Sequence, residues 1–219
     1  MYKVVIFDID GTLLDATEGI LSSVNKTINY LKLKKLSKKE MLDFVGPPIQ
    51  NSYKAIYENN DIKAQEFANI FRKEYAGGDV YKANAYDGIE ELLSLLKNNG
   101  YKLGVATYKR QDYANGLIIH FGFDKYIDLI CGSDNENKLK KSDILRICIN
   151  GLTTNKSEVI FIGDSYHDAE AANNLGIDFI GVTYGFGFKT KYEIQKYNPV
   201  LCADNIEEII KYFKFVNAL

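Results

Sequence analysis

The stretch Val4-Val5-Ile6-Phe7-Asp8-Ile9-Asp10-Gly11-Thr12 decides the fold of this chain. Residues 4–9 form a short, apolar run rich in β-branched side chains, which is typical of a strand buried on both faces of a sheet. Two aspartates stand at its carboxyl end, where parallel sheets build their binding sites. Asp8 and Asp10 are separated by one residue, so on a strand both side chains point to the same face. We therefore predict a buried parallel strand that ends in a site.

A second acidic cluster, Gly163-Asp164-Ser165-Tyr166-His167-Asp168, follows another apolar run at residues 159–162. If the two runs are neighbouring strands, Asp164 faces Asp8 and completes a cage of carboxylates. Carboxylates this close repel one another unless a cation or a shared proton offsets them. Because Mg²⁺ takes oxygen ligands, the pattern favours a magnesium site over a simple Asp-Gly turn.

Further apolar runs alternate with helical patterns along the rest of the chain. Strands are expected at residues 102–106, 159–162 and 179–182, with weaker candidates at 129–131 and 200–202. Helices are expected at residues 89–96, 112–121, 142–150, 168–175 and 206–213. This alternation predicts an α/β fold, a doubly wound, Rossmann-like parallel sheet.

One region interrupts the alternation, because residues 17–85 carry helical patterns and no convincing strand. Ser37-Lys38-Lys39-Glu40 has the spacing of a capping box that opens a helix ending near Phe44. Gly46-Pro47-Pro48 forms a turn before the next helix, and another helix is expected at residues 63–75. We predict a catalytic core made of residues 1–15 and 86–219, with an inserted all-helical cap of residues 16–85.

Composition narrows the classes of function. A net charge of −2 gives no general attraction to nucleic acid or to anionic membranes. No apolar run approaches the roughly 20 residues that a membrane span needs. Cys131, Cys148 and Cys202 are an odd number without metal-ligand spacing, and the start of the sequence does not read as a signal peptide. We expect reduced cysteines in a cytoplasmic protein that binds neither nucleic acid nor membrane.

Other polar residues stand next to the expected strands. Thr107 ends the strand at residues 102–106 and offers a hydroxyl and backbone donors to a phosphate oxygen, although a helix N-cap or a strand-end turn is a strong alternative. Of Lys138, Lys140 and Lys141, one would balance the carboxylates while the other two are solvated. Lys109 and Arg110 either meet substrate or lie in solvent, and these two readings stay open. His167 is expected at a helix start or on the surface.

The ordered set Asp8-x-Asp10-Gly11-Thr12, Thr107, Lys141 and Gly163-Asp164-x-x-x-Asp168 resembles the haloacid dehalogenase superfamily. Within it, the chain is most similar to the phosphoglycolate-phosphatase-like branch, which carries a helical C1-type cap after the first strand. The segments Phe44-Val45-Gly46-Pro47-Pro48 and Tyr86-Asp87-Gly88-Ile89-Glu90-Glu91-Leu92-Leu93 also resemble that branch. The resemblance covers essentially the whole chain.

This resemblance implies a role for each matching residue. Asp8 matches the nucleophile, and Asp10 matches the general acid and base. Thr107 and Lys141 match the groups that hold the phosphoryl oxygens. The implied Mg²⁺ ligands are Asp8, the backbone carbonyl of Asp10, and Asp164, with Asp168 in support. Ser142 stands where many relatives have proline after the motif lysine.

The resemblance implies a magnesium-dependent phosphatase acting on a small phosphorylated metabolite: phosphoglycolate, a sugar phosphate, a nucleotide or pyrophosphate. One alternative is a phosphosugar mutase of the same fold, but Ile20 stands where such mutases carry a histidine. Another is a non-enzymatic receiver that holds a stable phospho-aspartate, although receivers are about half this length and lack a cap. Either a monomer or a homodimer is compatible with the sequence.

Overall fold

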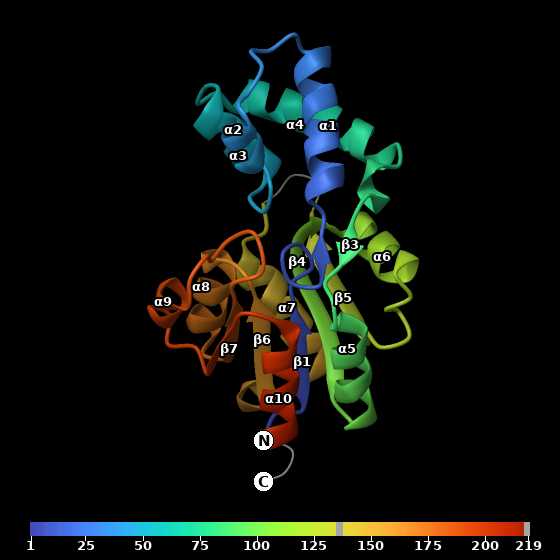
Figure 1. The fold of residues 1–219 in the computed structure, drawn as a ribbon, viewed down its shortest axis with the longest axis vertical. Helices are drawn as coiled ribbons and strands as arrows, with labels where there is room; N and C mark the ends of the chain where they lie inside the picture. The colour runs from blue at the N-terminus through green and yellow to red at the C-terminus, as the bar shows by residue number, and fades with distance from the viewer. Residues whose placement is uncertain (135–137, 217–219) are drawn as a thin grey trace. The chain divides into compact units, whose positions relative to one another are not determined.

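The computed structural model describes residues 1–134 and 138–216 (Figure 1). The chain divides into two compact units, one of Met1–Leu14 with Ala85–Leu219 and one of Asp15–Asn84. The sequence-based boundaries, after residues 15 and 85, each lie one residue beyond these divisions. The first unit carries all the predicted site residues.

The first unit is built on a six-stranded sheet in which every neighbouring pair of strands is parallel. Its strand order is β5-β4-β1-β6-β7-β8. The strands are β1 (Val4–Phe7), β4 (Lys102–Arg110), β5 (Leu129–Ser133), β6 (Val159–Gly163), β7 (Asp178–Val182) and β8 (Leu201–Ala203). The predicted doubly wound α/β fold is therefore confirmed, and all six predicted strands are present.

Helices cover both faces of this sheet (Figure 1). They are α5 (Ile89–Asn98), α6 (Gln111–His120), α7 (Lys141–Leu152), α8 (Tyr166–Leu175), α9 (Lys191–Gln195) and α10 (Ile206–Val216), with a short 3₁₀ turn η2 (Lys156–Glu158). Helices α5 and α10 pack against each other on one face, and α7 and α8 do so on the other. Because both faces are covered, β1 and β6 are buried along their whole length, as their unbroken apolar runs predict.

The strand order of the sheet reverses at β1. It adds β4 and β5 on one side of β1, then returns through α7 to place β6 on the other side. The register aligns Phe7 with Val105 on β4 and with Ile162 on β6. The carboxyl ends of β1 and β6 therefore lie beside the middle of β4, at the point where the strand order reverses and where doubly wound sheets bind ligands.

The second unit is helical, with α1 (Thr17–Tyr30), α2 (Lys38–Leu42), α3 (Ile49–Ile56), α4 (Asp61–Ala76) and the 3₁₀ turn η1 (Asp79–Tyr81). The predicted capping box at Ser37 is present, with Glu40 as its partner. Phe44, Tyr53 and Phe67 pack together as the aromatic centre of this unit. A two-stranded sheet of β2 (Leu14–Asp15) and β3 (Asn84–Ala85) stands where the chain enters and leaves it, so the prediction of no strand up to residue 85 misses β3.

Two strand ends differ from the sequence prediction. Strand β1 stops at Phe7, so Asp8 and Asp10 both lie beyond it and the alternation of a strand does not place them on one face. Strand β4 continues to Arg110, so the prediction that Thr107 ends it is wrong. Both differences fall in the segments that carry the predicted site.

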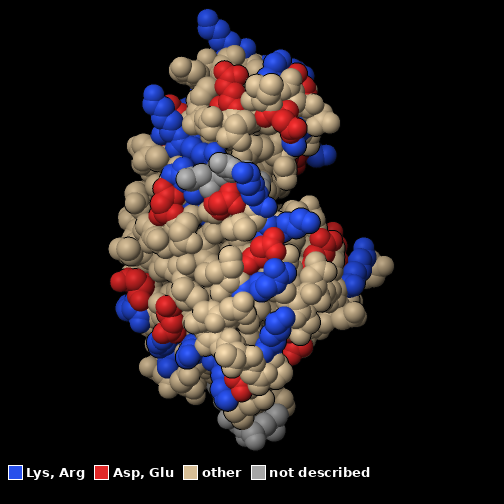
Figure 2. Space-filling view, turned by 180° about the vertical axis from the view of Figure 1, so that it is seen from behind, with Lys and Arg blue, Asp and Glu red and all other residues tan. Residues whose placement is uncertain are grey.

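Three further observations concern membrane-spanning helices, surface charge and cysteine thiols. No helix in the described part of the chain is both long and apolar enough to span a membrane. On the face shown in Figure 2, basic and acidic side chains are interspersed and form no large basic area. Cys131 and Cys148 are buried, Cys202 is half-buried, and all three thiols are free.

Candidate active site

Asp8 and Asp164 directly follow the carboxyl ends of β1 and β6, and Thr107 lies beside them in the neighbouring strand β4. Asp8 N donates to Ile162 O at 3.0 Å, which continues the ladder one residue past β1. The exposed fractions of Asp8, Thr107 and Asp164 are 7%, 1% and 3%. Three polar residues are therefore buried together at this edge, as the parallel register predicts.

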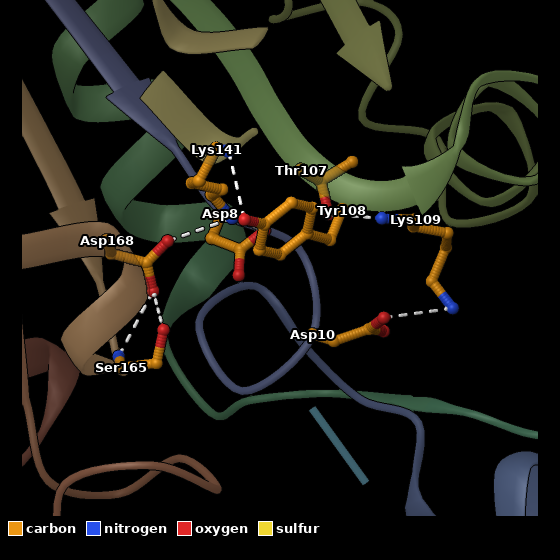
Figure 3. Close-up of polar contacts among 8 residues, drawn as sticks. All are labelled: Asp8, Asp10, Thr107, Tyr108, Lys109, Lys141, Ser165 and Asp168. Carbon is orange, nitrogen blue, oxygen red and sulfur yellow. Dashed lines mark hydrogen bonds and ion pairs between the residues drawn. The ribbon is translucent and has the colours of Figure 1, made fainter. Parts of the chain in front are cut away.

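Lys141 is the first residue of α7 and points at Asp8 (Figure 3). Its Nζ atom lies 2.9 Å from Asp8 Oδ1 and 2.8 Å from Asp168 Oδ1, and its side chain is 4% exposed. Lys138 and Lys140 are exposed. Of the three lysines considered from the sequence, the structure brings only Lys141 to the carboxylates.

Asp168 holds both Lys141 and the start of α8. Its Oδ2 atom accepts hydrogen bonds from Ser165 N at 3.0 Å and Ser165 Oγ at 2.6 Å (Figure 3). Its Oδ1 atom faces Lys141, so both carboxylate oxygens are occupied. The side chain is completely buried, and this position suits a residue that orients Lys141.

Asp164 is fixed by a loop between β7 and α9. Its Oδ2 atom accepts hydrogen bonds from Phe186 N at 2.6 Å and Gly187 N at 2.9 Å. On its other side is Gly11, whose φ of +82° favours glycine. A Cβ atom on Gly11 would stand 2.2 Å from Asp164 Oδ2, so only glycine allows this approach.

Burial and mutual repulsion set the electrostatics of the carboxylates. Burial raises the pKa of Asp8 to about 6, helped by Asp168 and Asp10 and opposed by Lys141. Burial also raises the pKa of Asp164 to about 7, helped by Asp168 and Asp8. Burial opposes the charge on Lys141, but the neighbouring carboxylates outweigh it and raise the pKa of Lys141. The ammonium group therefore stays charged.

The described residues leave a negative excess that a cation would offset. Asp8, Asp164 and Asp168 each offer a carboxylate oxygen, and these atoms lie within 4.8 Å of one another. The cluster holds four carboxylates and two ammonium groups, a net charge of −2, from Asp8, Asp10, Asp164, Asp168, Lys109 and Lys141. Hard oxygen ligands with this excess fit a divalent ion such as Mg²⁺.

Thr107 lies in an irregular part of β4. Its Oγ1 atom accepts a hydrogen bond from Lys109 N at 3.2 Å. The next side chain, Tyr108, reaches α7, where its hydroxyl accepts a hydrogen bond from Lys141 N at 3.0 Å. The irregular segment of β4 thus contributes Thr107 to the site. Its neighbour Tyr108 holds the start of α7, the helix that carries Lys141.

Lys109 is the site residue whose role sequence reasoning left open. Its Nζ atom lies 3.0 Å from Asp10 Oδ2, and its side chain is 5% exposed (Figure 3). The solvated alternative is therefore wrong for Lys109. Its position two residues after Thr107 was not a reliable signal, because β4 is irregular there and the alternation of a regular strand does not apply. Asp10 turns toward Lys109, while Asp8 turns toward Lys141.

Arg110 and His167 are engaged outside this cluster. Arg110 forms an ion pair with Asp112, and its guanidinium stacks 4.0 Å from the ring centre of Tyr113. His167 is at the start of α8, as expected, but it is half-buried. Burial lowers the pKa of His167, which favours its neutral form.

Comparisons with known proteins identify the family of this chain. The family described as haloacid dehalogenase-like hydrolase matches residues 5–182. A 5'-nucleotidase from Pseudomonas aeruginosa is 32% identical over 93% of this chain and 92% of its own length. The pyrophosphatase PpaX from Halalkalibacterium halodurans is 28% identical over 89% of each chain.

A solved structure has a similar fold over nearly the full length of this chain. A predicted phosphatase from Clostridium acetobutylicum superimposes with a TM-score of 0.90, at 33% identity, over 97% of this chain and 98% of its own. The family match spans most of the sequence and includes Asp8, Thr107 and Asp164. This chain therefore belongs to the haloacid dehalogenase-like hydrolases and is an enzyme of their phosphatase type.

Proposed function

We propose that this enzyme is a magnesium-dependent phosphatase that hydrolyses small phosphate monoesters through an aspartyl-phosphate on Asp8. The observation that carries the proposal is the pairing of two neighbouring aspartates with different lysines. Asp8 faces Lys141 and Asp10 faces Lys109. Two carboxylates in different surroundings are suited to two roles, one as nucleophile and one as acid and base.

In the first half-reaction, a carboxylate oxygen of Asp8 attacks phosphorus and the bond to the leaving oxygen breaks. With a pKa of about 6, Asp8 is mostly ionised at pH 7.5 and is competent as a nucleophile. Asp10 gives its proton to the leaving oxygen, so the product departs as a neutral alcohol. Lys141 and the Thr107 segment hold the phosphoryl oxygens, which supplies the positioning that phosphoryl transfer requires.

In the second half-reaction, Asp10 acts as a base. It takes a proton from water as the water oxygen attacks the phosphorus of the aspartyl-phosphate. The bond between Asp8 and phosphorus breaks, inorganic phosphate leaves, and both aspartates return to their starting states. Because the same carboxyl group gives and then takes one proton, the cycle balances without a further acid.

The residues that would hold Mg²⁺ are Asp8, the backbone carbonyl of Asp10, and Asp164. Asp168 belongs to the buried group of three carboxylates, but its oxygens already meet Lys141 and Ser165. We therefore assign it to support and not to the metal. When bound, the ion would offset the charge of the carboxylates and of the phosphoryl group.

The substrate class is proposed only as a small phosphate monoester. The relatives' names differ in substrate, since one is a 5'-nucleotidase and another a pyrophosphatase. The experiment is a screen for phosphate release from nucleoside monophosphates, sugar phosphates, phosphoglycolate and pyrophosphate, with Mg²⁺ and with EDTA. We expect Mg²⁺-dependent release from at least one monoester.

The covalent step is tested with Asp8→Asn. The amide keeps the shape of the side chain but is not a nucleophile, so turnover should disappear while the melting temperature is kept. Wild-type protein given labelled substrate and quenched in acid should carry phosphate on Asp8. A folded Asp8→Asn protein with near-normal turnover would rule out the aspartyl-phosphate.

A further inference from the structure

Strand β4 is irregular at the segment that carries Lys109. Ala106 pairs with Cys131 on β5, and the next aligned pair is Arg110 with Ser133. Three residues of β4 therefore stand opposite the single residue Gly132. Extra residues in one strand bend it and redirect its side chains, and such irregularities are frequent beside active sites.

Specific contacts hold this irregular segment in place. Gln111 accepts a hydrogen bond from Gly132 N at 2.6 Å and donates one to Ile130 O at 3.0 Å. Its side chain therefore pairs with backbone groups of β5 beside the bulge. A Cβ atom on Gly132 would lie 2.7 Å from Lys109 O and 2.6 Å from Gln111 Cα. Glycine at this position lets the bulged backbone of β4 approach closely. The bulge in β4 therefore sets the direction in which the Lys109 side chain points.

The surroundings of Lys109 favour a fixed ion pair. Lysine is seldom buried unless it is paired, because removing an ammonium group from water is costly. Lys109 is nevertheless buried, and its Nζ atom lies 3.0 Å from Asp10 Oδ2. The Asp10 side chain is itself only 17% exposed, so water screens this pair less than a surface pair.

The two oxygens of Asp10 differ in their contacts. Oδ2 faces Lys109, whereas Oδ1 is buried and accepts no hydrogen bond within the described part of the chain. A carboxyl group held through one oxygen presents the other in a defined direction. Because Oδ1 has no hydrogen-bond partner in the described residues, it is the oxygen that can exchange a proton with a leaving group or a water held within the site.

We propose that Lys109 is a positioning residue that holds Asp10 by Oδ2 so that Oδ1 performs the proton transfers. This inference rests on the proposed function, because it gives Asp10 the role of acid and base. Lys109 acts through Asp10, and the bulge in β4 sets its position. A misplacement of about 1 Å in a reacting group lowers rates by roughly 100-fold, which is the scale expected when Lys109 is removed.

The experiment compares leaving groups. A leaving alkoxide needs its proton, whereas p-nitrophenolate leaves without one. Lys109→Met should therefore lower kcat/KM for alkyl phosphates by about 100-fold, at the lower end of the range for acid catalysis. For p-nitrophenyl phosphate the first step should be nearly unaffected, measured as the pre-steady-state burst of nitrophenolate. Asp10→Asn should show the same dependence with a larger loss.

Two further variants separate positioning from general damage. Arg110→Met removes the neighbouring cation, which pairs with Asp112 outside the carboxylate cluster, and should leave both substrates within about threefold of wild type. Adding Lys109→Met to Asp10→Asn should cause no further loss, since the two residues act as a unit. If Lys109→Met does not fold, Lys109→Arg keeps the charge, and it should show the same leaving-group dependence with a smaller loss.

The outcomes distinguish this inference from the proposed function. If wild-type protein releases phosphate from no ester, the proposed function fails and the inference falls with it. If wild type is active and Asp10→Asn depends on the leaving group, but the Lys109 variant loses activity equally with all substrates, only the inference is overturned. Additive losses in the double variant would overturn it as well.

Discussion

Replacement of Lys141 by methionine is the most informative perturbation of the carboxylate cluster. Methionine keeps much of the length of the side chain but removes the ammonium group that lies 2.9 Å from Asp8 Oδ1 and 2.8 Å from Asp168 Oδ1. Both carboxylates are buried, so water does not replace the lost cation. We expect losses of both stability and turnover, for separate reasons.

The loss of stability follows from the burial of this pair. Removing one partner of a buried ion pair destabilises a protein by about 3–5 kcal/mol. In a protein of this size, each kcal/mol lowers the melting temperature by about 2–4 °C, so Lys141→Met should melt roughly 6–20 °C below wild type. Typical stabilities of about 5–15 kcal/mol leave most such variants folded at 25 °C.

The destabilisation should grow with pH. In wild type, the raised pKa of Lys141 means that its stabilising charge is present throughout the neutral range. Without Lys141, the pKa of Asp8 rises further above about 6. At low pH, Asp8 in the folded variant is therefore protonated, and burying it without a cation lowers stability little. As pH rises through that folded pKa, the carboxylate ionises without its partner and stability is lost.

The assay is thermal unfolding in EDTA at pH 5.5 and 8.0, together with phosphate release in Mg²⁺ at 25 °C. Turnover should fall by about 100- to 1,000-fold, the usual effect of losing one group that stabilises charge in the transition state. Lys140→Met, at the exposed neighbouring position, is the matched control and should stay within about 0.5 kcal/mol of wild type. A Lys141→Met protein that melts within 2 °C of wild type (roughly 1 kcal/mol) and turns over within threefold would refute the assignment.

Four other predictions concern the metal ion, the pH dependence of stability, Tyr108 and Ile20. Mg²⁺ should restore activity after EDTA treatment, whereas Ca²⁺ should inhibit, measured as phosphate release, because its larger and more flexible shell displaces the attacking carboxylate. In EDTA, stability should fall as pH rises from about 4 to 8 in calorimetry, because the pKa values of Asp8 and Asp164 are raised above their unfolded values. Tyr108→Phe should lower stability to urea by about 1 kcal/mol, since its hydroxyl accepts from Lys141 N. With Ile20 in place of a proton-carrying histidine, β-glucose 1-phosphate should yield free phosphate and no glucose 6-phosphate in a coupled assay.

The fold was predictable because its strands are buried on both faces. A strand covered on both sides needs an unbroken apolar run, and β1 and β6 have such runs in the sequence. The parallel register then accounts for the approach of Asp164 to Asp8. Lys141 was separable from Lys138 and Lys140 because the start of a packed helix fixes its position.

The local geometry of the site was not predictable from these patterns. The sequence after Ala106 turns polar at Thr107-Tyr108-Lys109-Arg110, which resembles a loop, although β4 continues through it as a bulge. The bulge depends on contacts with β5, about 20 residues further along the chain, and no short-range pattern reports them. The hydrogen bonds from Phe186 and Gly187 to Asp164 are likewise long-range contacts.

The distribution of the two lysines gives a physical reason why aspartates only two residues apart take different roles. Burial raises the pKa of Asp8, and Lys141, which Asp8 shares with Asp168, offsets this only partly, so the pKa is about 6, below neutral pH. Asp10 faces Lys109 on the other side, through one oxygen. A single lysine between the aspartates would draw both carboxylates to one point and leave neither free to attack or to carry a proton. Separate cations keep the Asp8 side chain beside Lys141 and turn the Asp10 side chain toward Lys109, as a nucleophile and a proton carrier in one site require.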